Sequence, residues 1–433
     1  MNTKADRRTP GFDQRREHWK HSHVPLLYDW MLSRKCPWPS ACVQFGLGYD
    51  SRDTYTDRTL YLSERTGETG DANTLYVASA RVANEHATRS ADVTKKWSEN
   101  VYRDPLPSSD FRIKKKIIHP GEVNRVRELR EGVVVTHTDH PNLFVWDIER
   151  QPHRKDTSKG VESNVPDLTL VGHQANAEYA VESVEEGKII ASGGKDKLVL
   201  IWQMEDYETL LSSKNSHLLN RTILRGHSDT VEGLAFNPED SRRLVSGGDD
   251  KCVFFWDTRK SAATGKINDA HQGDVNCVDW SHNGMYIASG GADQRIRIWD
   301  VRQLSQSSEV TSFADLREHT GQINEVQFQP CGNSSVLGSC AEDGQVLLWD
   351  IAQVESDSKS STGGEIPSLL LFRHYGHQYA VSEFQWSTVP DDPWTIASVS
   401  EDEEGATLQI WRPLDLIYNS PVDAANILRS EGI

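Results

Sequence analysis

The sequence predicts an all-β fold, a seven-bladed β-propeller with an N-terminal α-helix packed on its side. Three observations lead to this prediction. A phrase of about twelve residues recurs along the chain, its copies are spaced at roughly the length of one propeller blade, and strand-like segments separated by Gly, Asp, Asn or Pro fill each interval. The chain has 433 residues, and a repeat array can bury one continuous core over such a length.

The recurring phrase is a tight turn followed by a strand, as in SGGADQRIRIWD at 289–300. An Asp stands six positions before the final Trp in four copies, and seven or nine positions before it in the outer two. The six Trp residues lie 56, 54, 43, 50 and 62 residues apart (Trp146, Trp202, Trp256, Trp299, Trp349 and Trp411). A His precedes each Asp by 20 to 25 residues (His119, His173, His227, His271, His319 and His377). Each interval therefore predicts one blade of three or four strands.

The Ser, His and Asp of each copy have a structural explanation. Asp favours tight turns and accepts hydrogen bonds from backbone and imidazole, and a buried carboxylate needs such a partner. A catalytic triad is a single constellation at one site, whereas this trio recurs in near-copies, so we interpret it as a device that stabilises each blade. The chain contains neither a Walker loop nor GxGxxG, and its other His residues lack metal-ligand spacing. We therefore predict no enzymatic activity, no cofactor and no metal site.

Six copies leave one blade unassigned. Strand-like segments at 38–45, 59–63 and 74–82 predict a first blade that seals the ring against the C-terminal strands and removes open sheet edges. The expected organisation is an N-terminal arm and helix over 1–36, a propeller over 37–417 and a C-terminal segment over 418–433. Within the propeller, the first blade is expected at 37–112 and the six repeats at 113–417.

The segment 12–35 predicts the N-terminal helix. Its large apolar residues recur at spacings of three, four and seven (Phe12, Trp19, Leu26, Leu27, Trp30 and Met31). Pro25 is expected to bend or restart this helix. A helix outside a propeller lies against the side of the ring, where it serves as a packing strut or as one wall of a binding groove.

Composition narrows the class of protein. The net charge of −17 and the pI near 5.4 argue against nonspecific binding of nucleic acid or membranes and favour basic partners. The longest apolar runs are far shorter than the roughly 18 to 20 residues of a membrane span, and the start of the chain lacks a signal-peptide pattern. The six cysteines contain no CxxC pair, which is typical of a reducing compartment. We expect a soluble protein of the cytosol or nucleus.

A column of polar residues follows the repeat histidines by five positions (Asn124, Glu178, Glu232, Asn276, Asn324 and Ser382). Equivalent positions in a propeller converge on one rim of the central channel. Glu122 and Asp274 stand two positions earlier in their repeats, so the rim is expected to be acidic. Such a rim suits an extended peptide bearing Arg or Lys, because charge-assisted hydrogen bonds are stronger than neutral ones. The alternative interpretation is that positions beside loops are simply polar.

The repeats resemble WD repeats over residues 119–411, and the whole chain resembles one WD subfamily, the retinoblastoma-binding histone chaperones. The similarity is carried by PLLYDWMLSRKCPWPS (25–40), IIHPGEVNRVREL (117–129), THTDHPNLFVWD (136–147), SGGKDK (192–197) and DPWTIASVSED (392–402). TLQIWRPLDLIY (407–418) is most similar to the plant branch of the subfamily, which acts in chromatin silencing.

The resemblance implies a non-enzymatic, nuclear adaptor, a monomer within hetero-complexes that assemble chromatin, deacetylate histones or act as Polycomb-type complexes. Relatives hold the tail of histone three on the acidic face, and the matching residues are Glu122, Asn124, Arg125, Glu178, Tyr179, Glu232, Asn276 and Glu401. Relatives also hold a helix of histone four in a side groove, for which the resemblance implies Leu27, Trp30, Met31, Glu365 and Pro367. The loop 355–372 lacks the acidic double-proline core usual in relatives, so the tail site is the stronger expectation.

A rival interpretation comes from the endings of two repeats. Trp256-Asp-Thr-Arg259 and Trp299-Asp-Val-Arg302 match the WDxR ending of substrate receptors of cullin ubiquitin ligases. On this interpretation Arg259 and Arg302 contact the cullin adaptor, and the role is compatible with histone binding. The motif is weak evidence, because WD already belongs to the repeat and only the Arg is additional.

Overall fold

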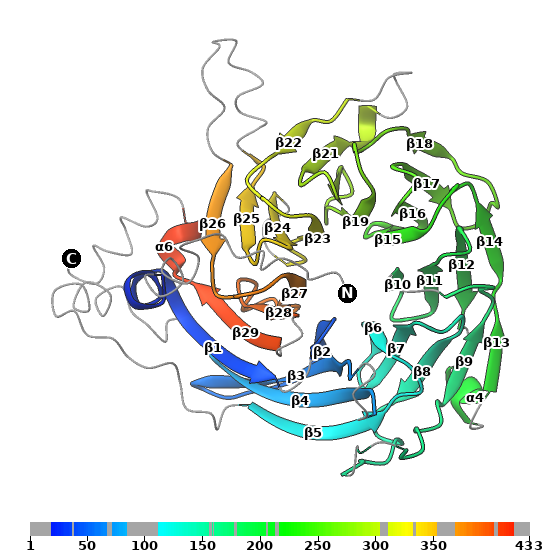
Figure 1. Cartoon of the computed structure of the whole chain (residues 1–433), viewed down its shortest axis with the longest axis horizontal. Coiled ribbons are helices and arrows are strands. Elements are labelled where there is room, and N and C mark those ends of the chain that lie inside the picture. The colour runs from blue at the N-terminus through cyan, green and yellow to red at the C-terminus, as the bar shows by residue number, and fades with distance from the viewer. Residues whose placement is uncertain are drawn as a thin grey trace, which may run out of the picture.

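Seven β-sheets are arranged as blades around a central axis in the computed structural model of the protein, so the prediction of a seven-bladed propeller is confirmed (Figure 1). The structure describes residues 19–36, 39–66, 72–84, 111–155, 158, 160–176, 180–204, 207–212, 216–303, 311–331, 335–352, 369–401 and 406–419.

Blades 1 to 4 follow one another along the chain. Blade 1 contains β2 (Val43–Ser51), β3 (Tyr55–Glu64), β4 (Thr74–Ala83) and β5 (Phe111–Ile118). Blade 2 contains β6 (Val123–Arg130), β7 (Val133–Thr138), β8 (Leu143–Asp147) and β9 (Leu168–Val171), with β13 (Ser216–Leu219) added in parallel to β9. Blade 3 contains β10 (Val181–Val184), β11 (Ile189–Gly193), β12 (Leu198–Gln203) and β14 (Thr222–Arg225). Blade 4 contains β15 (Val231–Asn237), β16 (Asp240–Gly248), β17 (Val253–Asp257) and β18 (Gly265–Ile267).

Blades 5 to 7 complete the ring. Blade 5 contains β19 (Val275–Trp280), β20 (Tyr286–Gly291), β21 (Ile296–Asp300) and β22 (Ala314–Leu316). Blade 6 contains β23 (Ile323–Phe328), β24 (Val336–Ala341), β25 (Val346–Asp350) and β26 (Leu370–His374). Blade 7 contains β27 (Val381–Trp386), β28 (Ile396–Ser400), β29 (Ala406–Pro413) and β1 (Tyr28–Cys36).

The helices in the described ranges are short and lie outside the blades. They are the π-helix η1 (Trp19–His23), α2 (Val24–Leu27), α4 (Tyr207–Ser212), the 3-10 helix η4 (Val301–Gln303) and α6 (Asp415–Tyr418). None of these described helices has the length and hydropathy required to cross a membrane.

The repeated phrase forms a hydrogen-bonded chain that explains its residue types. In blade 5, Trp299 Nε1 donates to Ser289 Oγ at 2.9 Å, His271 Nε2 lies 2.8 Å from the same oxygen, and His271 Nδ1 lies 2.8 Å from Asp293. Burial alone raises the pKa of the Asp293 carboxyl, but its hydrogen bonds outweigh that effect and lower it to about 2. The same chain recurs in blade 4 (His227, Ser246, Asp250 and Trp256) and in blade 6 (His319, Ser339, Asp343 and Trp349).

Blade 2 departs from this arrangement. His119 Nδ1 lies 3.0 Å from the Gly121 carbonyl oxygen, and Asp139 instead accepts a hydrogen bond from the backbone N–H of Glu122 at 3.2 Å. The longer interval between Asp139 and Trp146 is the sequence counterpart of this change. His119 is buried, and burial lowers its pKa to about 3, so this imidazole is neutral at physiological pH.

The hydrophobic core is divided into seven clusters, one between each pair of neighbouring blades. The Trp residues of the repeated phrase are among the most deeply buried side chains, because each is wedged between blades. Continuous burial around the ring requires that the last blade also meets the first.

The N-terminal segment closes the ring as a strand, which corrects the sequence prediction. Helical structure is confirmed only for 19–27, and the predicted helix residues 12–18 lie outside the described residues. Residues 28–36 form β1, which pairs antiparallel with β29. Tyr28, Trp30 and Leu32 alternate inward, and hydrogen bonding to β29 outweighs the helical spacing of the apolar residues. The propeller therefore begins at Tyr28 rather than at residue 37.

Blade 1 has four strands where the sequence predicted three segments. The predicted segments 59–63 and 74–82 lie within β3 and β4, whereas 38–45 overlaps only the start of β2 at Val43. β5 is the fourth strand of blade 1 and extends to Ile118, beyond the predicted boundary at 112, because it pairs with β4 along its whole length.

The helix η1 and strand β1 are fixed to the ring by a buried aromatic cluster. Trp19 packs edge-on against Tyr28, with ring centroids 5.7 Å apart, and against His374. Tyr28 Oη lies 2.7 Å from His374 Nδ1, and His374 Nε2 lies 2.7 Å from Gln409 Oε1. The helix thus lies on the side of the ring at blades 6 and 7 (Figure 1).

A buried ionic cluster joins the two ends of the ring. Arg412 of β29 contacts Asp29 of β1 at 2.7 Å and Asp392 at 3.1 Å, while Arg58 of blade 1 also pairs with Asp392. The four side chains are at most 10 % exposed. Arg412 also donates to the carbonyl oxygens of Ala83 and Asn84 at 3.0 and 3.1 Å, so one guanidinium holds three parts of the closure together.

We expect Arg412→Met to destabilise the propeller strongly, because it leaves Asp29 and Asp392 as buried carboxylates with one cation fewer. Removing one partner of a buried ion pair costs about 3 to 5 kcal/mol. Thermal unfolding followed by circular dichroism measures the change. Arg242→Met is the matched control, because Arg242 pairs with Asp240 at the surface, where solvent screens the pair and its loss changes stability little. Equal effects of the two substitutions would contradict a stabilising role for the closure cluster.

Candidate functional site

The inner strands of the blades surround the central axis of the ring, where the channel of a propeller runs (Figure 1). These strands are β2, β6, β10, β15, β19, β23 and β27. Each of the five described column residues is the second residue of its inner strand. The topology therefore places the column at one rim of the channel, as the sequence predicted.

A β-bulge in the inner strand lies at each of these column positions. The register between inner and second strand shifts at Asn124, Glu232, Asn276, Asn324 and Ser382. A bulge places an extra residue in one strand and redirects its side chain. The side chains of the column residues consequently do not follow the alternating directions of an ordinary strand. The periodicity of the sequence does not reveal this change of direction.

Three of the column residues use their side chains to join neighbouring blades. Asn276 Nδ2 donates to the Ile323 carbonyl oxygen at 2.8 Å, and Asn324 Nδ2 donates to the Val381 carbonyl oxygen at 2.8 Å. Ser382 Oγ donates to the carbonyl oxygen of Ser40, immediately before blade 1, at 3.0 Å. These three polar side chains therefore stabilise the ring. Ligand binding alone does not account for the polar residues at these positions.

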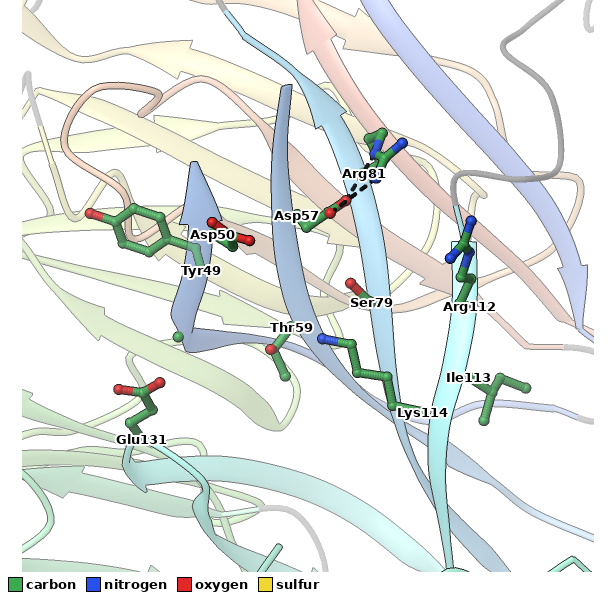
Figure 2. A pocket seen from close by; sticks show the side chains of 11 residues that line it. Tyr49, Asp50, Asp57, Thr59, Ser79, Arg81, Arg112, Ile113, Lys114 and Glu131 are labelled. Atoms are coloured by element: carbon green, nitrogen blue, oxygen red, sulfur yellow. Dashed lines mark hydrogen bonds and ion pairs between the residues drawn. The ribbon is translucent and has the colours of Figure 1, made fainter. Parts of the chain in front are cut away.

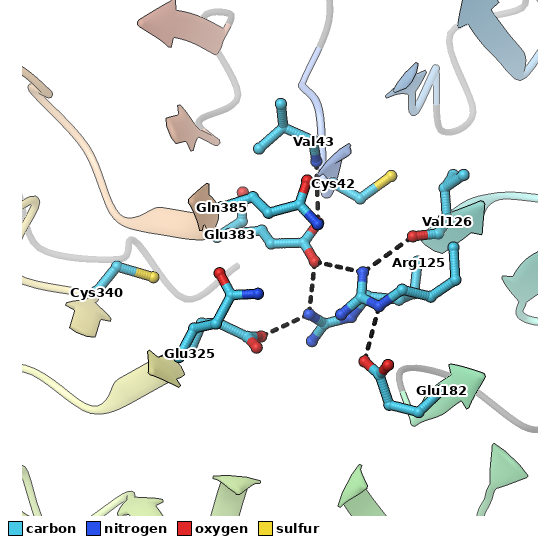
Figure 3. Close-up of polar contacts among 12 residues, drawn as sticks. Cys42, Val43, Arg125, Val126, Glu182, Glu325, Cys340, Glu383 and Gln385 are labelled. Atoms are coloured by element: carbon cyan, nitrogen blue, oxygen red, sulfur yellow. Dashed lines mark hydrogen bonds and ion pairs between the residues drawn. The ribbon is translucent and has the colours of Figure 1, made fainter. Parts of the chain in front are cut away.

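Below the rim, an ionic network joins side chains of several inner strands (Figure 3). Arg125 Nη1 contacts Glu325 at 2.5 Å and Glu383 at 2.7 Å. Arg127 contacts Glu182 at 2.7 Å and Glu383 at 2.9 Å. The adjacent hollow, which Glu232 also lines, holds roughly 20 Å³ for solvent, about the space of one water molecule. This hollow is therefore too small to hold a peptide side chain.

Arg125 has a structural role in this network. Its side chain is 11 % exposed, and its carboxylate partners raise the pKa of its guanidinium well above the ordinary value despite burial. Sequence analysis placed Arg125 among the tail-binding residues. Its described contacts are to channel carboxylates, so it supports the rim from below.

At the rim itself, predicted residues from two distant parts of the chain surround a guanidinium that sequence analysis missed. Arg65 Nη2 donates to Asn124 Oδ1 at 2.6 Å, and Arg65 Nη1 donates to Glu401 Oε1 at 3.0 Å. Arg65 Nε lies 4.0 Å from Glu122 Oε2. The carboxylate side chains of Glu122 and Glu401 remain 36 % and 29 % exposed, so a ligand has access to both.

The remaining predicted tail-binding residues have different positions. Glu232 is half-buried on the channel wall beside Asn276. Because Asn276 Nδ2 is held by the backbone of blade 6, its amide orientation is fixed. Glu178 and Tyr179 lie outside the described residues.

The residues predicted for the side groove are not all accessible. Leu27 and Met31 are half-buried and pack against the cluster between blades 6 and 7. Trp30 is only 5 % exposed and belongs to the core between blades 7 and 1, because it points inward from β1. It is therefore a core residue and not a groove wall. Glu365 and Pro367 lie outside the described residues.

The two arginines of the WDxR endings are exposed, and each pairs within its own repeat. Arg302 contacts the two carboxylate oxygens of Asp300 through Nε and Nη2, both at 2.8 Å. Arg259 contacts Asp257 in the same way at 2.8 and 2.7 Å. This ion pair accounts for an Arg two positions after the Asp, and no contact with a partner protein is needed to explain it.

A hollow of about 600 Å³ lies at the opposite end of blade 1 (Figure 2). The strands β2 to β4 are longer than the inner strands of the repeats. Gly48 lies beside Glu131 there, and a Cβ atom at this position would displace the exposed Glu131 carboxylate. The lining carries both charges, including Asp57 in a bidentate pair with Arg81, and contains none of the predicted site residues.

Among the described residues, no group of three or more His, Cys, Asp or Glu side chains is arranged to hold a metal ion. The six cysteines form no disulfide, and burial raises the pKa of the Cys36 thiol to about 11, which keeps this thiol protonated.

Comparison with known proteins supports a histone-related function. The family model for the histone-binding protein RBBP4 and its counterpart in the CAF1 complex matches residues 14–84. The model of the WD domain, G-beta repeat, matches residues 164–203, 219–257, 264–300 and 310–350. The WD-40 repeat-containing protein MSI4 of Arabidopsis thaliana is 36 % identical over 442 residues, which cover 96 % of this chain and 84 % of that protein.

The channel network generates a pH-dependent prediction at Asp279. Its carboxylate accepts a hydrogen bond from the Phe328 N–H at 2.6 Å, while burial, with a contribution from Glu182 and Glu325, raises its pKa to about 8. Because the folded state disfavours the ionised form, the cost to stability begins above about pH 4 and is complete above about pH 8.

We therefore expect Asp279→Asn to stabilise the protein, since the amide oxygen still accepts the Phe328 N–H and carries no charge. The increase in melting temperature should exceed about 2 °C at pH 8.5 and should be smaller at pH 5. Thermal unfolding at the two pH values measures the difference. A gain that does not depend on pH would contradict the raised pKa as its cause.

Proposed function

The chain belongs to the family of histone-binding WD-repeat proteins that includes MSI4, and on this basis we propose that it is a non-enzymatic adaptor that holds a basic histone tail on the rim of its channel. The tail is that of histone three, and the adaptor acts in the nucleus as a subunit of chromatin assembly, deacetylase or Polycomb-type complexes. One observation carries the proposal: Glu122, Asn124 and Glu401 converge around a single guanidinium at the rim.

This convergence supports a site for cations on chemical grounds. Asn124 and the two carboxylates already bind one arginine, so their geometry suits a guanidinium or an ammonium group. Glu232 and the exposed Asp274 add negative charge along the same rim. The net charge of −17 raises the local concentration of basic ligands further.

The proposed binding mode is surface contact by an extended peptide. The acceptors come from blades 2, 4, 5 and 7, so a ligand that contacts all of them crosses the mouth. A helix of histone four is a second proposed ligand. Its support is the family model over 14–84, with Leu27 and Met31 as the half-buried described residues at that side of the ring.

The rim proposal is tested with a labelled, unmodified peptide of the histone-three tail. We expect Glu122→Lys and Glu232→Lys each to weaken binding at least tenfold, because each replaces an attractive charge by a repulsive one. Raising the salt concentration should weaken binding to the native protein, since these carboxylates are partly exposed. Fluorescence anisotropy measures the affinities.

Glu239→Lys provides the matched control. Glu239 is exposed in the hairpin between β15 and β16, at the far end of the inner strand from the rim. It receives the same change of charge, and it should leave the affinity unchanged. Undiminished affinity in both rim variants would exclude the rim as the binding surface.

A further inference from the structure

We propose that Arg65 is a built-in occupant of the rim site, which a basic ligand displaces in order to bind. Arg65 then sets the affinity of the rim by competing for Glu122, Asn124 and Glu401. This inference rests on the proposed function, because it concerns the control of the same site.

The first argument is the identity of the contacts. Arg65 satisfies the acceptors that are proposed to hold a ligand cation, at 2.6 Å for Asn124 and 3.0 Å for Glu401, with Glu122 at 4.0 Å. The Arg65 side chain is 17 % exposed, so it covers the space between these acceptors. Two cations cannot share this space without repulsion, and a ligand therefore exchanges with Arg65.

The second argument is that the fold anchors Arg65 at its backbone. The Arg65 N–H donates to the Pro39 carbonyl oxygen at 2.9 Å, and the Thr66 N–H donates to Asn73 Oδ1 at 3.1 Å. Asn73 in turn accepts the His119 N–H through its carbonyl oxygen at 2.8 Å. The side chain therefore starts from a fixed point beside the rim, and only its own torsions need to change for it to leave.

The third argument compares Arg65 with Arg125. Arg125 pairs with Glu383, whose side chain is 3 % exposed, so its departure would leave a buried carboxylate without a partner. The carboxylate partners of Arg65 are 36 % and 29 % exposed, and water can solvate both of them when Arg65 leaves. The third partner, Asn124, is only 6 % exposed, so its amide oxygen needs the cation of the incoming ligand as a new donor. Arg65 is thus displaceable, whereas Arg125 is fixed in the ring.

Arg65 could also have the opposite role and assist ligand binding, and its removal would then change the affinity in the opposite direction. If Arg65 mainly orients the carboxylates for a ligand, its removal weakens binding. If it competes with the ligand, its removal leaves the rim one charge more negative and strengthens binding. The direction of the change in affinity therefore separates the two roles.

The experiment uses the full chain and the histone-three tail peptide with Arg65→Gln, Arg65→Lys and Arg259→Gln. Arg259→Gln is the matched control, because it removes the same charge from an exposed Asp–Arg pair at the opposite end of a blade. We expect Arg65→Gln to bind at least about fivefold more tightly with a steeper salt dependence. Arg65→Lys retains the competing charge and should remain within twofold of the native affinity, as should Arg259→Gln. Melting temperatures establish that each variant is folded.

Each outcome has a definite meaning. Tighter binding by Arg65→Gln alone supports the inference, and so does binding by Arg65→Gln where the native protein does not bind. Binding by the native protein that Glu122→Lys abolishes, together with unchanged or weaker binding by Arg65→Gln, overturns the inference and leaves the proposed function intact. Absence of binding by the native protein and every Arg65 variant overturns the proposed function itself.

Discussion

Closure of the ring is the constraint on which the rest of the structure depends. A propeller brings residues that are hundreds of positions apart to one rim only when its first and last blades are joined. Here β1 completes blade 7 beside β29, and the cluster of Arg412, Asp29, Asp392 and Arg58 joins that blade to blade 1. The contact between Arg65 of blade 1 and Glu401 near the C-terminus exists only because of this closure.

The same inner-strand positions serve the ring and the site. Each bulge redirects one polar side chain, and the role of that side chain depends on which groups of the neighbouring blade it contacts. Asn276, Asn324 and Ser382 find backbone carbonyls to which they donate, so they join blades. Asn124 meets the side chain of Arg65 instead, because the turn of blade 1 brings a guanidinium within reach. The rim therefore contains a mixture of structural and accessible acceptors, and a uniform ring of ligand contacts is not needed.

The sequence was most informative where the chain repeats itself. Six blades could be predicted because His, Ser or Thr, Asp and Trp recur at similar spacings, and in blades 4, 5 and 6 each set forms one hydrogen-bonded chain. β1 was missed because Tyr28, Trp30 and Leu32 alternate as a strand does, while neighbouring apolar residues also fit a helix. Glu122, Asn124 and Glu401 could be named from the resemblance. Arg65 could not, since blade 1 has no repeat motif and its contacts are formed between distant segments.

Burial divides the charges of this acidic protein into two groups with different consequences. In the channel, Glu383 and Glu325 are paired with Arg125 and Arg127 and are only 3 % and 13 % exposed, so their charges are neutralised where solvent screens them little. At the rim, Glu122 and Glu401 face solvent and share one guanidinium, which leaves a net negative charge on the surface. A buried pair that loses a partner destabilises the fold, whereas an exposed pair can exchange its partner at little cost. Exchange of cations is therefore confined to the rim, and the network beneath it keeps the acceptors in place while the occupant changes.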